Sequence, residues 1–468
     1  MKEIVTVAAT KILHAKSALL PVGWAQNLRI EVDGGGTIAA VGPVRAGESS
    51  AHETFGLVLP GIPNLHCHAF QRAMAGLAER AGPTGDDFWS WREVMYRFLD
   101  RLTPEEIEAI AAQLYLEMLK AGYTSVAEFH YLHNDPTGAA FANPAELSER
   151  VAAGAGRAGI RLTLLPVLYQ TGNFGGLPPN PGQRRFVKET DAFADLLERV
   201  AKLAHDTRAF RLGLAPHSLR AVPPESLHAA VSIIDRIDPT APIHIHAAEQ
   251  EKEVRDCIAW SGTRPVRWLL DNAHIDGRWV LVHATHIEHD ERQRLARSGA
   301  VAGLCPTTEG NLGDGLFPLR DYLSEEGRFG IGTDSNIVVD PAEELRWLHY
   351  GQRLSRERRS LEIDPPGTSL GTRLWHHSIA GGAQALGQAI GGLAVGNQAD
   401  LLVIDEEHPA LVGRVGDLAL DSLVFSSARG AVRHVMVGGH WVVRDHHHGD
   451  EDRITNAYRR VAQSLARA

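Results

Sequence analysis

Histidines in a His-x-His pattern give this chain its first candidate for metal chemistry. His66 and His68 stand on either side of Cys67 in LPGIPNLHCHAFQR. If this segment is a strand, both imidazoles project from one face toward a single ion, and Cys67 points to the opposite face. The chain contains 24 histidines, so such pairs also arise by chance. From this pair alone, the alternative interpretation is that both residues are surface histidines in a loop.

Three later segments supply further candidate ligands and acid–base groups, each after an apolar run. PIHIHAAEQ contains His244, His246 and Glu249, WVLVHATH contains His283 and His286, and FGIGTDSN contains Asp334. Neutral imidazoles with a carboxylate suit zinc or another borderline divalent ion, and a catalytic site leaves one position for water. His246 is nearer the strand end than His244, so we interpret His244 as an interior residue. Glu249 follows where the chain turns and is expected to reach the water rather than the metal.

Two other clusters are interpreted as structural. His446, His447 and His448 form the densest histidine run, in VRDHHHGDEDR, and we interpret this run as a solvated turn because no strand is expected there to converge the rings. Trp89 and Trp91 are interpreted as packing residues rather than as a platform for a stacked ligand. Neither cluster is expected to carry the chemistry.

Strands must position the candidate metal ligands, and the middle of the chain supplies them. From about residue 60 to residue 387, helical stretches such as PEEIEAIAAQLYLEMLKAG, with Thr103 as its N-cap, and ADLLERVAKLAHD alternate with apolar runs such as RLTLLPVLY, RLGLAPHS, PIHIHAAE, WVLVHATH and RFGIGTDS. This alternation over ~330 residues predicts a parallel sheet, and a (β/α)8 TIM-like barrel is the economical solution at that length. Active sites of such barrels lie at the carboxyl ends of the strands, where the histidines and Asp334 are found.

The two ends of the chain share a pattern that differs from the middle. LRIEVDGGGTIAAV alternates apolar and polar residues around a Gly-rich turn, which predicts a hairpin. QADLLVIDEEHP and RHVMVGGHWVVRD, near the C-terminus, contain similar short Val-rich strands. We therefore predict a small β domain built from residues 1–59 and 388–468, and a barrel domain from residues 60–387.

Bulk composition limits the classes of function. Apolar residues make up 44% of the chain and charged residues 22%, which is ordinary for a globular protein. A formal net charge of −10 argues against a general nucleic-acid binder, which would present a basic face. Charges at Glu3, Lys11 and Lys16 interrupt the first apolar runs, and the three scattered cysteines suit a reducing compartment. We expect a cytoplasmic protein that binds neither nucleic acid nor membrane.

Several stretches together resemble the amidohydrolase superfamily, its mononuclear zinc deaminase branch and, within that branch, the formimidoylglutamate deiminase family. The stretches are PGIPNLHCHAFQRAMAGLAER, FWSWREVMY, GYTSVAEFHYLHNDP, APHSLRAV, HIHAAEQ, LVHATH, CPTTEGNLGDG and GIGTDSN, and they span nearly the whole chain. The His-x-His, His-x-x-Glu, His and Asp pattern is specific to the superfamily only, whereas HAFQRAMAGLAER, FWSWRE and AEFHYLHNDP are similar to the deiminase. The implied fold is a (β/α)8 barrel with a composite β-sandwich domain formed by both termini.

The resemblance implies a site for one zinc ion per subunit, with iron(II) as the alternative metal. At the matching positions the ligands are His66, His68, His246 and Asp334, and the catalytic residues are Glu249, His283 and Asp334. Related nucleobase deaminases tend to have Ser-Asn after the Cys-Pro turn, whereas this chain has Thr308 and Glu309. This departure weakens the case for an aromatic base as substrate and makes Glu309 a candidate partner for a cationic amidine.

The implied reaction is the hydrolysis of N-formimidoyl-L-glutamate to N-formyl-L-glutamate and ammonia in histidine degradation. Its dicarboxylate substrate needs donors, and arginine binds carboxylates bidentately. The candidate substrate-binding residues are Gln71, Arg92, Tyr131, His217 and Arg220. A homodimer is expected by analogy with large barrels, and Arg92 then serves its own site or a neighbour's. The alternatives are a superfamily deaminase or chlorohydrolase that acts on a purine, pterin or triazine, and a non-catalytic relative that binds a ligand.

Overall fold

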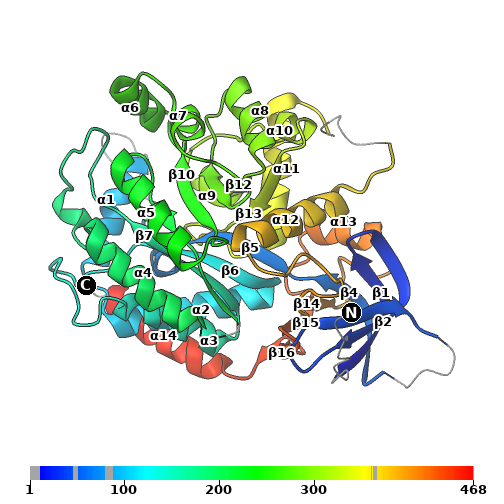
Figure 1. Ribbon diagram of the computed structural model, residues 1–468. Helices are drawn as coiled ribbons and strands as arrows, with labels where there is room; N and C mark the ends of the chain where they lie inside the picture. The colour runs from blue at the N-terminus through cyan, green and yellow to red at the C-terminus, as the bar shows by residue number, and fades with distance from the viewer. Residues whose placement is uncertain are drawn as a thin grey trace, which may run out of the picture.

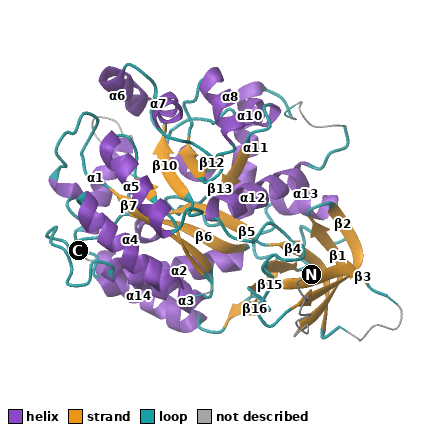
Figure 2. Cartoon of the chain, in the orientation of Figure 1, coloured by secondary structure: helices purple, strands orange, loops and turns teal. Residues whose placement is uncertain are grey.

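A computed structural model describes residues 11–45, 51–79, 88–205, 207, 209–359, 361 and 366–466. Figures 1 and 2 show a β-rich region that contains the N-terminal strands beside a larger region of alternating strands and helices. Among the described residues, no helix is both long and apolar enough to cross a membrane.

Parallel strands form the centre of the larger region. One group contains β5 (Ile62–Cys67), β6 (Tyr123–His130), β7 (Arg161–Leu168), β8 (Phe210–Leu212) and, beside β7, β9 (Ala215–Pro216); the other contains β10 (Ile243–Ala247), β11 (Trp279–His283), β12 (Val301–Leu304) and β13 (Arg328–Ile331). Parallel bridges join the groups at both edges, from Leu214 to Ile243 and from Cys67 to Asp334. The ring of strands confirms the predicted barrel, and each predicted apolar run lies in one of its strands.

Helices connect these strands and lie outside them. Between β5 and β6 the chain forms a 3-10 helix (Ala69–Met74), α1 (Phe88–Leu99) and α2 (Pro104–Ala121). The later connections contain α3 (Glu146–Ala158), a short 3-10 turn (Pro181–Gln183), α4 (Thr190–His205), α5 (Pro224–Ile237), α6 (Glu251–Ser261), α7 (Pro265–Asn272), α8 (His289–Ser298), α9 (Pro306–Leu312) and α10 (Leu319–Ser324). After β13 come α11 (Pro341–Arg356), α12 (Leu370–Leu386), α13 (Asp417–Phe425) and α14 (Glu451–Ala466).

Local sequence signals explain the ends of α2. Thr103 accepts a hydrogen bond from the Glu106 backbone, and the Glu106 side chain accepts one from the Thr103 backbone, so the predicted N-cap forms a full capping box. Gly122 ends the helix with φ 113°, a left-handed conformation that glycine adopts without a steric penalty. The following strand, β6, is buried along its whole length because α2 and α3 cover the barrel strands.

Strands from both ends of the chain form one eight-stranded sheet. They are β1 (Lys11–Leu20), β2 (Gly23–Val32), β3 (Ile38–Pro43), β4 (Glu53–Pro60), β14 (Leu401–Ile404), β15 (Val432–Val437), β16 (His440–Arg444) and β17 (His447–His448), in the order β17-β16-β15-β14-β4-β1-β2-β3. The predicted N-terminal hairpin is confirmed as β2 paired with β3. Because β4 pairs with β1 on one side and with β14 on the other, it joins the two ends of the chain. The predicted boundaries, 1–59 with 388–468 and 60–387, stay a prediction.

A buried ion pair links this terminal sheet to the barrel. Arg161, at the start of β7, donates from Nε to Asp400 Oδ2 at 3.1 Å and from Nη2 to Asp400 Oδ1 at 3.3 Å. The two side chains are 5% and 3% exposed. Gly438, in the turn between β15 and β16, also donates its backbone N–H to Asp400 at 2.6 Å. The carboxylate of Asp400 therefore accepts hydrogen bonds from both parts of the fold.

Candidate active site

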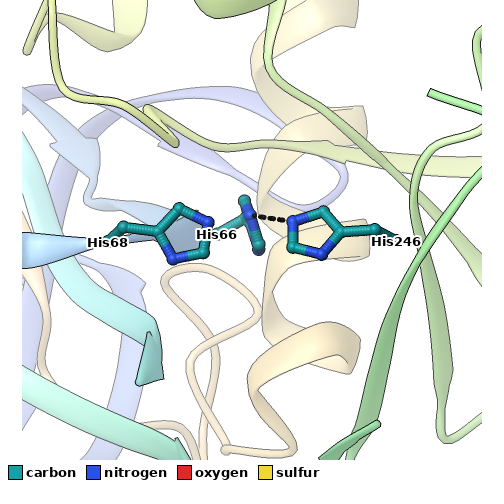
Figure 3. A group of neighbouring side chains, drawn as sticks. All are labelled: His66, His68 and His246. Atoms are coloured by element: carbon teal, nitrogen blue, oxygen red, sulfur yellow. Dashed lines mark hydrogen bonds between the residues drawn. The ribbon is translucent and has the colours of Figure 1, made fainter. Parts of the chain in front are cut away.

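Three histidines and one aspartate meet at the carboxyl ends of the barrel strands. Figure 3 shows the ring of His66, from β5, between those of His68 and His246. His66 Nε2 lies 3.1 Å from His246 Nε2. Asp334, just after β13, places Oδ1 at 3.5 Å from His66 Nε2 and at 3.2 Å from His68 Nε2. The structure thus brings together the four residues predicted as metal ligands.

Backbone carbonyls orient two of these imidazoles. His68 Nδ1 lies 2.9 Å from the Phe129 carbonyl oxygen, and His246 Nδ1 lies 3.0 Å from the His217 carbonyl oxygen. Because a carbonyl oxygen only accepts, each Nδ1 must carry the proton, which leaves the Nε2 lone pair free. The Nε2 atom of His68 faces Asp334, and the Nε2 atom of His246 faces His66.

Burial sets the protonation states of this group. It lowers the pKa of His66 to about 3 and the pKa of His246 well below its ordinary value, because a buried imidazole resists a positive charge. Burial opposes ionisation of Asp334, but its interactions with His66 and His68 outweigh burial and hold the pKa of Asp334 well below its ordinary range. Neutral imidazoles beside an ionised carboxylate are in the state that a divalent metal requires.

His283 and Glu249 lie on the other side of Asp334. His283 Nε2 is 3.7 Å from Asp334 Oδ2 and 3.8 Å from Glu249 Oε1. Burial alone would lower the pKa of His283, but the surrounding carboxylates of Glu249, Glu309 and Asp334 raise it to about 10. Burial is also the main reason that the pKa of the Glu249 carboxyl is raised. All three predicted catalytic residues therefore lie within one buried group.

The backbone is strained where these side chains leave their strands. Ala248, His283 and Asp334 have φ values of 51°, 66° and 46°, in the left-handed region. Such a conformation costs a non-glycine residue roughly 1–3 kcal/mol and persists only where the surrounding structure imposes it. Strain of this kind is common at functional sites. Here it occurs at His283 and Asp334 themselves, and at Ala248, which directly precedes Glu249.

Glu309 lies behind His283, at the start of α9. Its Oε1 lies 3.2 Å from His283 Nδ1 and accepts the Cys305 backbone N–H at 2.9 Å. His283, Cys305 and Glu309 also place their donor atoms within 4.8 Å of one another, a grouping that the sequence analysis missed. Burial raises the pKa of the Cys305 thiol well above its ordinary value, which keeps it protonated and makes it a poor metal ligand.

A cavity beside the histidines contains all five residues predicted to bind substrate. Its lining includes Gln71, Arg92, Tyr131, His217 and Arg220 together with His68, His246, Glu249 and Asp334. Gln71 Nε2 donates to the Tyr131 hydroxyl at 2.8 Å. Arg92 Nε, Arg220 Nε and Gln71 Oε1 are buried without a hydrogen-bond partner in the described structure. These groups are suited to a polar ligand, since an unpaired buried donor or acceptor is costly.

Aromatic and sulfur-containing side chains complete the cavity wall, and sequence reasoning missed them. They are Phe88, Met95, Tyr96, Tyr169 and Phe186. Trp91, which was interpreted from the sequence as a packing residue, lines the cavity as well. Tyr96 is four residues after Arg92 in α1, so helical spacing puts both on one face and could have identified it. Tyr169 and Phe186 follow β7 in a long connection that carries no comparable signal.

The histidine run at 446–448, the tryptophan pair and His244 were all interpreted as structural residues. The structure shows what each of them contacts. His447 and His448 form β17, and the buried His448 ring donates from Nε2 to the Ala158 carbonyl at 3.0 Å, so the solvated-turn interpretation is wrong for His448. Trp89 packs against Arg92, whose Cζ lies 4.6 Å from its ring centroid. His244 donates from Nε2 to the Ala385 carbonyl at 2.9 Å, away from the metal ligands.

Comparisons with known proteins place this arrangement in a family. The sequence profile of the Amidohydrolase family matches residues 57–442, and that of the formimidoylglutamate deiminase HutF N-terminal domain matches residues 10–51. A formimidoylglutamate deiminase from Pseudomonas aeruginosa is 52% identical over 453 residues, which cover 97% of this chain and 99% of that protein.

Solved structures share the fold over almost the whole chain. An amidohydrolase from Brucella melitensis superposes with a TM-score of 0.92 at 45% identity, covering 98% of this chain and 100% of that one. An adenosine deaminase from Xanthomonas campestris with bound zinc superposes with a TM-score of 0.81 at 20% identity, covering 98% of each chain. The profile match, the near full-length identity and the shared architecture agree, and the chain belongs to the amidohydrolase family and, within it, to the formimidoylglutamate deiminases.

Proposed function

We propose that this chain hydrolyses N-formimidoyl-L-glutamate to N-formyl-L-glutamate and ammonia, a step in histidine degradation. The observation that carries the proposal is the 52% identity over 97% of the chain with a formimidoylglutamate deiminase. The cavity supports it, because two arginines and a glutamine, each with a buried atom that has no hydrogen-bond partner in the described structure, lie beside side chains that could hold a metal. A substrate with two carboxylates and a reactive amidine needs donors for the carboxylates and a metal beside the amidine.

The resident metal in this proposal is one zinc ion, with iron(II) as the alternative, held by His66, His68, His246 and Asp334. The donor set fits zinc, since two nitrogens each about 2.1 Å from a tetrahedral ion are about 3.4 Å apart. The observed separation of His66 Nε2 and His246 Nε2 is 3.1 Å. A zinc-bound relative of the same fold adds support. Bound zinc would supply Lewis acidity, which makes water nucleophilic at neutral pH and polarises the amidine.

The chain's own acid–base groups would move the protons. Asp334, whose pKa is held low, would accept the proton that the attacking water loses. Glu249 lines the cavity and has a raised pKa, so it can hold a proton and deliver it to the nitrogen that departs as ammonia. His283 Nε2, which is buried without a hydrogen-bond partner among the described residues, would hydrogen-bond the tetrahedral centre that forms when water adds to the amidine.

The substrate carboxylates would be held by Arg92, Arg220, Gln71, Tyr131 and His217. Burial and the nearby Arg220 hold the pKa of His217 well below its ordinary value, so the ring is neutral. Arg92 lines the cavity of its own chain, which favours a role in its own site. Arg220 also contacts Glu249, with Nη2 at 3.4 Å from Oε2, and would therefore connect the bound carboxylate to the proton donor.

Steady-state assays of the zinc-loaded protein test this function. We expect ammonia release from N-formimidoyl-L-glutamate and none from guanine, adenosine or a triazine. Removal of the metal with a chelator should abolish the activity, and added zinc should restore it, because side chains cannot supply the Lewis acidity of the metal. Release of ammonia from a purine but not from the formimino substrate would instead favour a nucleobase deaminase, and no turnover of any of them would favour a non-catalytic relative.

Replacing Arg220 by Met is expected to lower kcat/KM by roughly 30-fold or more without loss of zinc. Truncating one partner of a buried, hydrogen-bonded charge pair costs about 2–5 kcal/mol, and 1.4 kcal/mol is a factor of ten. Kinetics with substrate analogues that lack one carboxylate separate carboxylate binding by Arg220 from an indirect effect through Glu249. If Arg220 binds a carboxylate, the variant should no longer discriminate between the substrate and the analogue that lacks that carboxylate. Arg278→Met is the control, since Arg278 pairs with Asp235 at 2.7 Å near the start of β11. Wild-type discrimination by R220M would remove Arg220 from the carboxylate site.

A homodimer and a cytoplasmic location complete the proposal. The three cysteines are free and buried, as suits a reducing compartment. Light scattering should give about twice the chain mass of 50.9 kDa, and a single-chain mass would contradict the dimer. Cell fractionation should recover the protein with cytoplasmic markers.

A further inference from the structure

His283 is contacted from two sides by acidic side chains. Its Nε2 faces Glu249 Oε1 and Asp334 Oδ2, at 3.8 and 3.7 Å. Its Nδ1 faces Glu309 Oε1, at 3.2 Å. The ring is fully buried, and the backbone at its Cα is left-handed, with φ 66°. Both ring nitrogens therefore face acidic side chains, whose contacts can set the orientation of the ring.

Glu309 is itself held firmly at the first turn of α9. Its Oε1 accepts the Cys305 backbone N–H at 2.9 Å. On the other side of the turn, Glu344 from α11 accepts the Thr307 backbone N–H at 2.9 Å and the Thr307 hydroxyl at 2.5 Å. The next residue, Thr308, donates its hydroxyl to the Thr333 carbonyl at 3.1 Å. A carboxylate fixed in this way can orient the group that it contacts.

We propose that Glu309 is a positioning residue for His283, which accepts the Nδ1–H and so presents Nε2 to the reacting amidine. The proposal rests on the proposed function for the identity of the substrate. A carboxylate acts only as an acceptor, so the Nδ1 that faces it carries a proton and donates it to Glu309. Without it the ring can rotate about its bond to Cβ, and Nε2 no longer faces Glu249 and Asp334.

This role differs from a direct contact between Glu309 and a cationic substrate, which the sequence suggested. Glu309 Oε1 is 3.2 Å from His283 Nδ1, on the side of the ring away from Glu249 and Asp334. Its influence on the substrate therefore passes through the imidazole. A residue that acts through another one loses its effect when the other is removed, and a double-mutant cycle measures this.

The experiment compares the zinc-loaded variants E309L and E309Q, alone and combined with His283→Gln. E309L lacks an acceptor and should lower kcat by about 10²-fold or more, with a small change in KM. E309Q keeps an amide oxygen that can accept the Nδ1–H, and it should retain clearly more of kcat than E309L. In the H283Q background, E309L should cause no further loss. A loss of the same size in that background would overturn the proposal, as would a wild-type kcat for E309L.

A substrate-free measurement separates this inference from the proposed function. The proton NMR spectrum of the wild type should contain a far-downfield imidazole N–H resonance that disappears in H283Q and E309L and persists in E309Q. Its persistence in E309L would contradict the proposal even if no substrate is turned over. Glu344→Gln is the matched control: it disturbs the same turn through Thr307, and its effect on kcat should add to that of H283Q. If E309L does not fold, E309A, which also lacks an acceptor, takes its place in both measurements.

Discussion

Replacing Glu249 by Gln is expected to lower kcat by about 10²- to 10⁴-fold while the zinc content stays at the wild-type level. A positioned general acid or base contributes a factor of this size, and the amide cannot donate or accept the transferred proton. The shape of the side chain is kept, so the 3.4 Å contact with Arg220 and the cavity wall should survive. Steady-state kinetics of ammonia release, together with metal analysis of the same sample, measure both quantities.

The neighbouring Glu253 is the matched control for this variant. It is also a buried glutamate, but its carboxylate accepts the backbone N–H groups of Ala248 and Glu249, at 3.2 and 3.1 Å. Glu253→Gln should therefore affect stability more than the chemical step. Loss of zinc from E249Q would mean that Glu249 is a ligand, and a kcat close to that of the wild type would remove it from proton transfer.

The candidate metal site could be predicted from sequence because its signals are local. His66 and His68 share one strand end, and His246 is followed by Glu249 at the next turn of the chain. The barrel itself brings the separate strand ends together, so recognising the strand–helix alternation was enough to place Asp334 and His283 near them. The same reasoning explains why β2 and β3 were predicted, since a hairpin also depends on neighbouring residues only.

The contacts that connect distant segments could not be predicted. Glu309 is 26 residues from His283, and its carboxylate reaches the ring only because α9 turns directly after β12. Tyr169 enters the cavity from the connection after β7, whose course depends on packing rather than on a periodic pattern. His448 was interpreted as solvated because no strand was expected there, and the strand that contains it has only two residues. Periodicity shows which residues share an element, and it does not show which elements meet.

The pair of Arg161 and Asp400 is a buried contact of this distant kind, and Arg161→Met is expected to destabilise the protein by about 3–5 kcal/mol. The two residues are 239 positions apart and almost fully buried. Removing one partner leaves the Asp400 charge uncompensated in a medium of low polarity, which is the costly case for a buried ion pair. Urea unfolding followed by circular dichroism, with zinc present, measures the change. The kcat of the folded variant should stay close to that of the wild type, since Arg161 begins β7 and the cavity lies beyond its other end.

A second substitution distinguishes a lost charge pair from lost packing. Combining Arg161→Met with Asp400→Leu removes both charges, and it should recover most of the stability because an apolar pair of similar size replaces a buried ion pair at little cost. Recovery should be incomplete, because Gly438 N–H loses the acceptor that it has at 2.6 Å. Arg294→Met is the control: its pair with Asp271 is 39% and 47% exposed, and such a pair contributes about 1 kcal/mol or less. If the double variant is no more stable than R161M, the cost comes from packing at the junction between barrel and terminal sheet, and the ion pair is not what holds the two together.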